Sequence, residues 1–385
     1  MNTSNNVILP GSTIGMVGGG QLGRMFAHAA SSMGYRVIVF CGSNNEPAAQ
    51  VAHGCVVGQL NDLAAVEAFA GQCDVITLEF ENIPAETIAA CQQYAPTHPS
   101  ASVLATAQDR LVEKNTLRNA GLPVAPFSEV TDFDSLSGAS EAVGWPLILK
   151  TARSGYDGKG QHRLESLEDA NAVDWGSQQQ WVAEKFVRFD REVSVVVART
   201  VDGRTSTFPV FENDHANHIL DITMLPAAVD GTVEQRAKEI AIAAAQSLGV
   251  VGLLCVEMFV KGDEVMINEV APRPHNSGHV TIEACHTSQF QQHVRAVCGL
   301  PLGSTDLVCG AAAMANLLGD LWPDEKTSPP WDRALSVSGI NLHLYGKQHA
   351  KSGRKMGHVS CVGSDRDQVV AAVKEARNRL TPYWH

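Results

Sequence analysis

The sequence contains no Cys-x-x-Cys pair, although it has nine cysteines scattered from Cys41 to Cys361. Closely paired cysteines are typical of zinc sites and thiol redox sites, so neither kind of site is predicted. An odd number of widely spaced cysteines also argues against a disulfide framework. The pattern predicts reduced, mostly buried thiols and a cytoplasmic protein.

Positive charge is also scarce. Lys and Arg together number 29 against 41 Asp and Glu, which gives a formal net charge of −12. A protein with this balance has no general field that attracts nucleic acid or an anionic membrane, so neither is an expected partner. Any site for an anionic small molecule must therefore be built locally.

Long apolar runs are missing as well. The most apolar stretch, 240–260, is interrupted by polar residues and glycines, which predicts a helix followed by a strand and no membrane span. The first residues, MNTSNNVILPGS, have neither the basic nor the long apolar region of a signal peptide. At 385 residues with 44% hydrophobic content, the chain is long enough for two or three soluble domains.

The first hundred residues alternate strand and helix patterns, which predicts a parallel sheet with helical crossovers. The predicted strands are 13–17, 36–40 and 74–78, and the predicted helices are 21–33, 62–72 and 85–94. Polar residues follow the third strand, at the sheet edge where ligands bind, and they could contact a sugar hydroxyl: Glu79, Glu81 and Asn82.

The first strand leads into a helix through Gly18, Gly20 and Gly23, which match the G-x-G-x-x-G pattern. Free N–H groups at such a helix start can bind phosphate. A nicotinamide site also needs an acidic residue after the second strand, and here the sequence reads Cys41-Gly42-Ser43. A phosphate cradle is therefore favoured over a dinucleotide site, and plain helix–sheet packing is the alternative.

A change in composition near residue 105 predicts a second domain, which opens with a charged helix over 109–120. The apolar strand 146–150 ends in Lys150 and precedes the glycine-rich segment 153–161. A lysine at a strand end beside such a segment is suited to hold a polyphosphate under a flap, with a plain turn as the alternative. The segment does not match a Walker A loop.

Further along, strands at 181–187, 191–200 and 206–212 predict an antiparallel sheet, and 233–248 predicts a helix. The strand 253–260 carries Glu257 as its single charge, and the stretch EVMINEVAPRPHNSGH at 264–279 begins as another strand. In a hairpin of the two, a two-residue loop places Asn268 opposite Glu257, and a three-residue loop places Glu269 there. Either pairing gathers oxygen ligands suited to Mg²⁺, and a structural ion-pair network is the alternative.

A helix is predicted over 288–298, and the carboxy-terminal part predicts strands at 311–316, 339–345 and 358–362 and a helix over 365–380. The segment GKQHAKSGRKMGH, at 346–358, concentrates positive charge in an acidic protein. It is either a solvated loop or a site for an anionic substrate.

Seven segments occur in order along the chain: GMVGGGQLGRM, EFENIP, LILKTARSGYDGKGQ, VAEKFV, VEMFV, NEVAPRPHNSGH and the pattern GKxxxKxGRKMGH. With them the chain resembles the 5-(carboxyamino)imidazole ribonucleotide synthases of purine biosynthesis, a branch of the ATP-grasp superfamily. The resemblance implies a pre-ATP-grasp domain at 1–104, with a Rossmann-like α/β sheet. It also implies a two-lobed α+β ATP-grasp domain at 105–302, with a flap lobe at about 120–187, and a β-rich domain at 303–385.

The same resemblance implies that ATP and bicarbonate carboxylate the amine of 5-aminoimidazole ribonucleotide through carboxyphosphate, with release of ADP and phosphate. Glu257 and Glu269 match the Mg²⁺ ligands, and the position of a further Asn ligand in many such enzymes is Ala271. The implied ATP-binding residues are Arg110, Lys150, Ser154, Gly155, Tyr156, Asp157, Gly158, Lys159, Gly160, Gln161, Glu184, Lys185, Phe186, Val187, Glu192, His215, Asn268 and Glu269.

Contacts to the ribonucleotide are implied for a second set of residues. They are Gly20, Gln21, Leu22, Glu81, Tyr156, Asp157, Arg273, Lys347, Arg354 and Lys355. Catalytic roles are implied for Arg273, His275, Asn276 and Lys347, with the first three suited to bicarbonate and carboxyphosphate. The resemblance also suggests a homodimer.

Three other functions compete with this one. A formate-dependent glycinamide ribonucleotide transformylase has a similar first loop and core, but the NSGH and GRKMGH segments argue against it. A nicotinamide oxidoreductase or nucleotide-sensing module is disfavoured by Cys41-Gly42-Ser43. A non-catalytic binding protein would leave the paired carboxylates and Lys150 unexplained.

Overall fold

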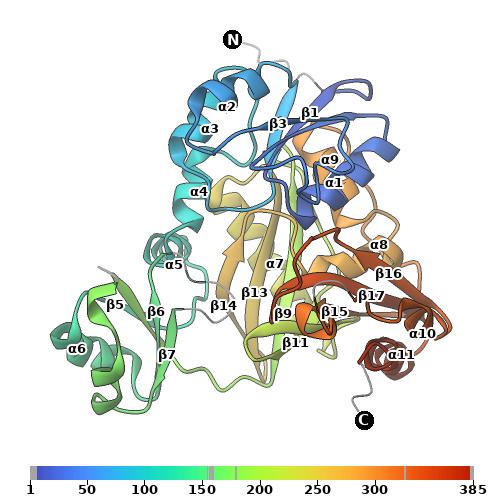
Figure 1. Ribbon diagram of the computed structural model, residues 1–385. Coiled ribbons are helices and arrows are strands. Elements are labelled where there is room, and N and C mark those ends of the chain that lie inside the picture. Colours follow the sequence, from blue (N-terminus) through green and yellow to red (C-terminus); the bar gives the residue numbers. More distant parts are fainter. Residues whose placement is uncertain (1–6, 154, 156–159, 178–179, 325–326, 382–385) are drawn as a thin grey trace.

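The computed structural model describes residues 7–153, 155, 160–177, 180–324 and 327–381. The described strands form a four-stranded parallel sheet, a four-stranded antiparallel sheet and a nine-stranded antiparallel sheet. In Figure 1 the parallel sheet lies at the top, the small antiparallel sheet at the lower left, and the large sheet runs from the centre to the right. No helix in the described part of the chain is long and apolar enough to cross a membrane.

The parallel sheet is the predicted amino-terminal α/β unit, with strand order β3-β2-β1-β4. Its elements are β1 (Thr13–Val17), α1 (Gln21–Ser32), β2 (Arg36–Cys41), β3 (Gly54–Val57), α2 (Leu63–Ala70), β4 (Val75–Leu78) and α3 (Ala85–Gln92). The short edge strand β3 was not predicted, because its four residues begin with a glycine and are only half buried. Phe26 of α1 packs against Phe290 and Val294 in one apolar core, which joins this unit to the centre of the molecule.

Two helices lead from this unit into the small sheet: α4 (Ala101–Ala107) and α5 (Arg110–Asn119). The small sheet has the order β5-β8-β6-β7 and is covered by α6. Its elements are β5 (Phe127–Val130), α6 (Phe133–Val143), β6 (Leu147–Thr151), β7 (Gln161–Leu164) and β8 (Trp181–Lys185). The helix α6 was not predicted from the sequence, although the capping box of Asp132 and Ser135 marks its start.

The large sheet has the order β14-β13-β9-β11-β12-β15-β17-β16, with β10 beside β9. Its central elements are β9 (Arg191–Arg199), β10 (Thr205–Thr207), β11 (Phe211–Ala216), β12 (Ile219–Leu225), α7 (Gly231–Leu248), β13 (Gly252–Lys261) and β14 (Glu264–Ala271). The single strand predicted at 206–212 is wrong: β10 ends before Pro209, which has no N–H for a ladder. Val195 and Val197 pack in one core with α7, whereas Val196 lies in the core on the other face, as the two-residue period of a strand requires.

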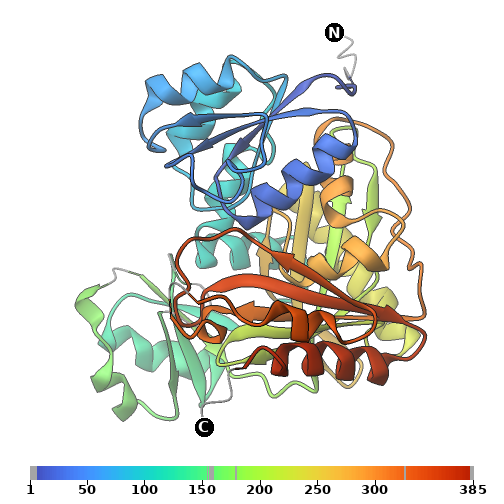
Figure 2. The same cartoon turned by 45° about the vertical axis from the view of Figure 1, so that its right-hand side comes forward.

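The carboxy-terminal strands continue this same sheet, because β15 pairs with β12. The elements of this part of the chain are η3 (Ser277–Val280), α8 (Thr281–Ala284), α9 (Gln289–Val297), β15 (Ala311–Leu318), η4 (Gly319–Leu321), α10 (Trp331–Leu335), β16 (Ile340–Leu344), β17 (Lys355–Gly363) and α11 (Arg366–Asn378). Figure 2 shows α11 lying along β15 and β17, whose apolar side chains it covers. Arg377 pairs with Asp221 of β12, so the last helix is also fixed to the central strands by charge.

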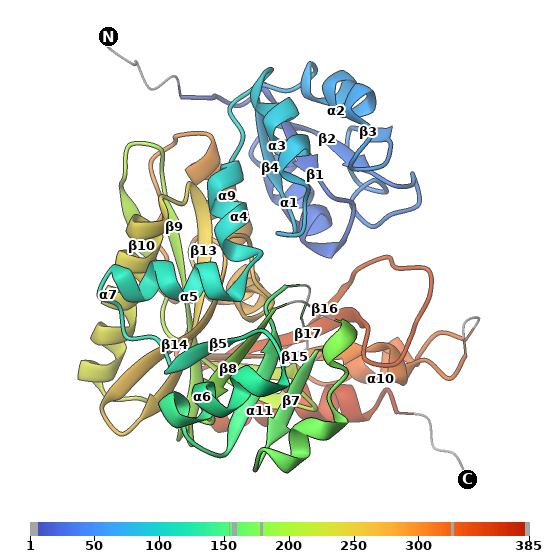
Figure 3. The same ribbon diagram turned by 90° about the vertical axis from the view of Figure 1, so that its left-hand side faces the viewer.

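The helix α5 lies where the three sheets approach one another. It packs on α7 and β14 and, in Figure 3, runs above the small sheet. Asp109 caps its first turn by accepting hydrogen bonds from the N–H groups of Leu111 and Val112. The capped helix start brings Arg110 to the space between the sheets.

Candidate active site

A cleft of about 1460 Å³ opens between the small sheet, the large sheet and the amino-terminal unit. Pockets for single small ligands usually measure about 300–1,000 Å³, so this cleft has room for more than one ligand. Most of the site residues expected from the resemblance line it. They are Gln21, Leu22, Glu81, Arg110, Lys150, Gly155, Gln161, Glu184, Lys185, Phe186, Val187, Glu192, His215, Glu257, Asn268, Glu269, Arg273, His275, Asn276 and Lys355.

The other expected site residues fall into two groups. Three are direct neighbours in the chain of a residue that lines the cleft: Gly20, Gly160 and Arg354. The fourth, Lys347, donates a hydrogen bond from Nζ to the carbonyl of the lining residue Lys355 at 2.7 Å. Five in the glycine-rich segment lie outside the described residues: Ser154, Tyr156, Asp157, Gly158 and Lys159.

Glu257 and Glu269 lie directly opposite each other on β13 and β14. The hairpin loop has two residues, because Lys261 faces Glu264, and a regular two-residue hairpin would place Asn268 opposite Glu257. A β-bulge resolves the two alternatives: Met258 faces Ile267, so Asn268 is the extra residue and Glu269 moves into the opposing position.

Each of the two carboxylates has a basic side chain as its partner. Glu269 Oε2 lies 2.6 Å from Nη1 of Arg110, and Glu257 Oε1 lies 2.8 Å from Nε2 of His275. Burial would raise the pKa of Glu269, but the charges of Arg110, Lys150 and Lys114 outweigh burial and hold the pKa at about 2. Glu269 is therefore ionised at neutral pH.

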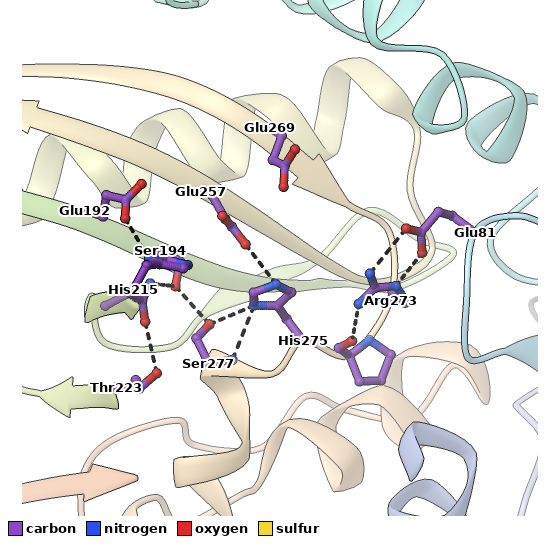
Figure 4. Close-up of polar contacts among 12 residues, drawn as sticks. Glu81, Glu192, Ser194, His215, Thr223, Glu257, Glu269, Arg273, His275 and Ser277 are labelled. Carbon is purple, nitrogen blue, oxygen red and sulfur yellow. Dashed lines mark hydrogen bonds and ion pairs between the residues drawn. The ribbon is translucent and has the colours of Figure 1, made fainter. Parts of the chain in front are cut away.

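These side chains fit a Mg²⁺ site. Figure 4 shows Glu257 and Glu269 projecting from neighbouring strands into the same space, and both offer hard oxygen donors. The described residues contain no group of three or more His, Cys, Asp or Glu side chains placed to hold a metal. The next residue on the same face of β14 is Ala271, whose side chain has no donor atom. A pair of carboxylates suits an ion that shares its remaining positions with nucleotide phosphates and water.

Glu184 lies at the centre of a buried charge cluster. Its two oxygens contact Nζ of Lys114 at 3.2 Å and Nζ of Lys150 at 2.9 Å. Burial would raise the pKa of Glu184, but the two lysines outweigh it and lower the pKa to about 2. Lys114 is fully buried and also donates to the carbonyl of Asn268 at 2.7 Å.

Lys114 was not predicted as a site residue, because its helix was interpreted only as charged. The available signal was its spacing of four residues from Arg110, which puts both cations on one face of α5. Glu113, beside it, is buried and lines the cleft, and burial raises the pKa of its carboxyl to about 8. A helix face with this much buried charge points to a ligand-binding role for α5.

Arg273 links the large sheet to the amino-terminal unit. Its guanidinium makes a two-pronged contact with the Glu81 carboxylate (Figure 4). Burial would raise the pKa of Glu81, but Arg273 outweighs it and lowers the pKa. The position of Glu81 after β4 is the one expected for a ligand-binding edge of the parallel sheet.

Nearby, two further expected residues contact each other at the rim of the large sheet. Glu192 of β9 and His215 of β11 form an ion pair, with His215 Nδ1 at 2.6 Å from Glu192 Oε2. Burial lowers the pKa of His215, but Glu192 outweighs it and raises the pKa above its ordinary value.

The glycine-rich loop before α1 is already occupied by a carboxylate. Glu79 accepts hydrogen bonds from the N–H groups of Gly20 and Gly23, the second at 2.9 Å, and a Cβ on Gly18 or Gly20 would collide with its side chain. The prediction of a phosphate cradle is therefore wrong for these N–H groups, because an internal anion takes the place of the phosphate. Burial raises the pKa of Glu79, and the two N–H donors oppose that shift.

This arrangement also argues against a nicotinamide site. A dinucleotide would need the same N–H groups for its pyrophosphate. We expect no binding of NADH in a fluorescence titration at millimolar concentration, and saturable binding would contradict this interpretation of the loop.

Comparison with known proteins agrees with this geometry. Family models match as "Ribonucleotide synthetase preATP-grasp domain" over residues 11–108, "ATP-grasp domain" over 115–290 and "Phosphoribosylaminoimidazole carboxylase C-terminal domain" over 312–372. The chain is 42% identical over 375 residues to the N5-carboxyaminoimidazole ribonucleotide synthase of Bacillus subtilis, covering 96% of each protein. It is 41% identical over 384 residues to a bifunctional purine synthesis protein of Dictyostelium discoideum, of which it spans only 37%.

A solved structure gives the same result. The N5-carboxyaminoimidazole synthase of Aspergillus clavatus, in complex with ADP and 5-aminoimidazole ribonucleotide, is 30% identical to the chain. The two superpose with a TM-score of 0.87 over 96% of this chain and 98% of the other. The chain therefore belongs to the N5-carboxyaminoimidazole ribonucleotide synthase family of ATP-grasp ligases.

Proposed function

We propose that this enzyme carboxylates the exocyclic amine of 5-aminoimidazole ribonucleotide with bicarbonate, using ATP, in purine biosynthesis. The observation that carries the proposal is one cleft containing two opposed carboxylates, the cations Arg110 and Lys150, and Arg273 bound to the amino-terminal unit. The cleft has room for both a nucleotide and a ribonucleotide.

ATP is assigned to the space between the small and large sheets. Arg110 and Lys150 contact its phosphates, the segment Glu184–Val187 offers backbone groups to adenine, and Glu192 with His215 binds the ribose side. Gly155 and Gln161, from the glycine-rich segment, line the same space. Arg110 pairs with Glu269 and Lys150 pairs with Glu184, and all four side chains line the cleft.

Glu257 and Glu269 would hold Mg²⁺, which supplies positive charge to the phosphate oxygens when it is bound. The charge that develops during phosphoryl transfer is also offset by Arg110 and Lys150 of the protein. Because little covalent chemistry falls to the protein, positioning and charge account for most of its contribution to the rate.

Bicarbonate is activated in the first step. Its oxygen forms a bond to the γ-phosphorus of ATP, the bond from that phosphorus to ADP breaks, and carboxyphosphate results. Arg273, His275 and Asn276 bind the bicarbonate and carboxyphosphate oxygens. Nδ2 of Asn276 supports this role, because it is a buried donor with no hydrogen-bond partner among the described residues.

The second step delivers the carboxyl group, directly or as carbon dioxide, to the amine nitrogen. A C–N bond forms, the C–O bond to phosphate breaks, and the nitrogen loses a proton. Gly20, Gln21, Leu22 and Glu81 contact the ribonucleotide, and Lys347, Arg354 and Lys355 bind its phosphate. The complex of the Aspergillus clavatus protein with this ribonucleotide supports the assignment of the substrate.

Substitution of Arg354 by alanine tests the proposed phosphate site. Arg354 is exposed on the positively charged segment 346–358, called here the basic loop, and its guanidinium donates to the carbonyl of His349 at 2.6 Å. Losing one charge-assisted contact to phosphate costs about 1.5–3 kcal/mol, which raises KM for the ribonucleotide by roughly 10- to 100-fold. KM for ATP should stay within about two-fold.

The exposed Lys374 of α11 provides the control, because it carries the same charge away from the cleft. Lys374→Ala should leave both constants unchanged. Equal losses for ATP and the ribonucleotide in Arg354→Ala would contradict the assignment of the basic loop.

The choice between bicarbonate and formate tests the reaction itself. We expect ADP release with 5-aminoimidazole ribonucleotide to rise when bicarbonate is added to degassed buffer and not when formate is added. Turnover with formate and glycinamide ribonucleotide alone would favour the transformylase.

We also propose a cytoplasmic homodimer and the domain boundaries near residues 105 and 303.

A further inference from the structure

We propose that four buried side chains form a positioning chain that fixes the orientation of the His275 ring. They are Ser277, Ser194, Asn213 and Thr223, and only Asn213 also reaches the cleft. The effect on turnover rests on the proposed function, whereas the ring orientation itself does not.

The chain is a continuous series of hydrogen bonds (Figure 4). Nδ1 of His275 lies 2.9 Å from Oγ of Ser277, which lies 2.9 Å from Oγ of Ser194. Nδ2 of Asn213 donates to Oγ of Ser194 at 2.8 Å, and Oγ1 of Thr223 donates to Oδ1 of Asn213 at 3.0 Å. On the other side of the ring, Nε2 lies 2.8 Å from Glu257. The ring is therefore anchored at both nitrogens.

The anchor at Nδ1 matters because the ring torsion of histidine is broad and roughly two-fold, so it does not define the ring by itself. Glu257 is also a proposed Mg²⁺ ligand, so a bound ion would compete with Nε2 of His275 for its carboxylate oxygens. Nδ1 also accepts a hydrogen bond from the N–H of Ser277 at 3.3 Å, so the Ser277 hydroxyl donates to it. The hydroxyl is the nearer of the two donors, and its bond to Ser194 links the ring to the rest of the chain and holds Nε2 toward the cleft.

The positioning chain contributes little to the stability of the fold, which indicates a role other than packing. Ser194 stands among four valines in β9, at positions 193 and 195–197, and both Ser194 and Thr223 are fully buried. Buried hydroxyls contribute little net stability even when they are paired, and apolar groups of the same shape can replace both partners at little cost. The backbone ladder already pairs β9 with β11 and β11 with β12, so these side chains are not needed to join the strands.

The register of the strands places the positioning chain beside the two carboxylates, Glu257 and Glu269. Ser194 lies opposite Glu257, which lies opposite Glu269, so all three side chains project from the same face of the sheet. Asn213 lies opposite Thr223 in the neighbouring row. The positioning chain therefore extends the proposed metal site on β13 and β14 sideways across three further strands, β9, β11 and β12.

Two substitutions of Thr223 test the proposal, because Thr223 is the far end of the chain and does not line the cleft. Thr223→Val keeps the shape and removes the hydroxyl, whereas Thr223→Ser keeps the hydroxyl and removes a methyl group. A role in packing predicts that serine is the worse replacement. A role in positioning predicts the reverse.

We expect Thr223→Val to lower kcat about five- to ten-fold with KM for ATP unchanged, and Thr223→Ser to stay within about two-fold of the unmodified enzyme. In a His275→Asn background, Thr223→Val should have no further effect, because the residue acts through His275. A larger loss in serine than in valine, or the same factor in both backgrounds, would overturn the proposal.

A readout without turnover separates this proposal from the proposed reaction. In protein labelled with ¹⁵N-histidine, the ring signals assigned to His275 by their loss in His275→Asn should shift or broaden in Thr223→Val and remain in place in Thr223→Ser. Unchanged signals in both variants would refute the positioning chain even in an active enzyme. Absence of bicarbonate-dependent turnover in the unmodified protein would refute the reaction and leave this ring test decisive for the chain.

Discussion

Replacing Glu269 by glutamine is expected to lower kcat by about three orders of magnitude while the fold stays intact. The variant keeps the shape of the side chain but removes the charge that lies opposite Glu257 and 2.6 Å from Arg110. One opposite charge at about 4 Å contributes roughly 4 kcal/mol at an effective dielectric near 20, which corresponds to about 10³-fold in rate. ADP release at saturating substrates and Mg²⁺ measures the loss.

A matched control lies on the same strand. Glu264 begins β14 and is exposed beyond the far end of the cleft wall, so Glu264→Gln should retain normal turnover. Circular dichroism of both variants should match that of the unmodified protein. Near-normal rates for Glu269→Gln at saturating Mg²⁺ would refute the metal role of this carboxylate.

Replacing Glu184 by glutamine is expected to destabilise the protein by about 3–5 kcal/mol. The change leaves Lys114, which is fully buried, without its carboxylate partner at 3.2 Å, and breaking one side of a buried ion pair typically costs this much. Denaturant unfolding measures the change. The double variant Glu184→Gln, Lys114→Met should recover part of the loss, because no unpaired buried cation then remains at position 114.

Acid sensitivity gives a second measure of the same residue. The pKa of Glu184 is depressed from 4.5 to about 2, so its contribution to stability is present above pH 4.5 and is lost as the pH falls toward 2. Glu184→Gln should therefore remove part of the decline of stability over that range.

The exposed pair of Arg163 and Glu165 is the control, and Glu165→Gln should cost less than about 1 kcal/mol. A loss of similar size in both variants would contradict the buried-pair argument.

The sequence predicted the elements that have strong periodicity and clear ends. The parallel sheet with its three helices, the helix α7 and the strands β13 and β14 were all anticipated from apolar patterns and turn residues. Several missed elements are short or polar: β3 has four residues, β7 reads Gln-His-Arg-Leu, and α6 contains Ser and Gly among its apolar residues. The apolar strand β12, with seven residues, was also missed. Their conformation depends on neighbours in space, which no local pattern reports.

The opposition of Glu257 and Glu269 shows the same limit at the site. Both residues were identified from the sequence, and each of the two loop lengths considered gave one possible partner for Glu257. The structure combines a two-residue loop with a bulge at Asn268, so the loop rule alone would have chosen the wrong partner. Register in a hairpin follows from the whole ladder, and a bulge leaves little trace in composition.

Three polar residues were misread or missed because their partners are far away in the sequence. Glu79 fills the glycine loop from 56 residues beyond Gly23, and Lys114 of α5 contacts Glu184 of β8 in the small sheet. Ser194 would be read as a mild interruption of a valine-rich strand, and its importance depends on Ser277 and Asn213. Sequence patterns identify which residues are unusual, whereas the fold decides what they contact.

The fate of the bicarbonate oxygen tests the proposed reaction most directly. In the proposed first step this oxygen bonds to the γ-phosphorus, and it stays with phosphorus when the C–O bond breaks. With freshly dissolved ¹⁸O-bicarbonate, ATP, Mg²⁺ and 5-aminoimidazole ribonucleotide, mass spectrometry of the released phosphate should show one ¹⁸O atom per molecule. Phosphate without the label would mean that water attacks ATP, and it would contradict the account.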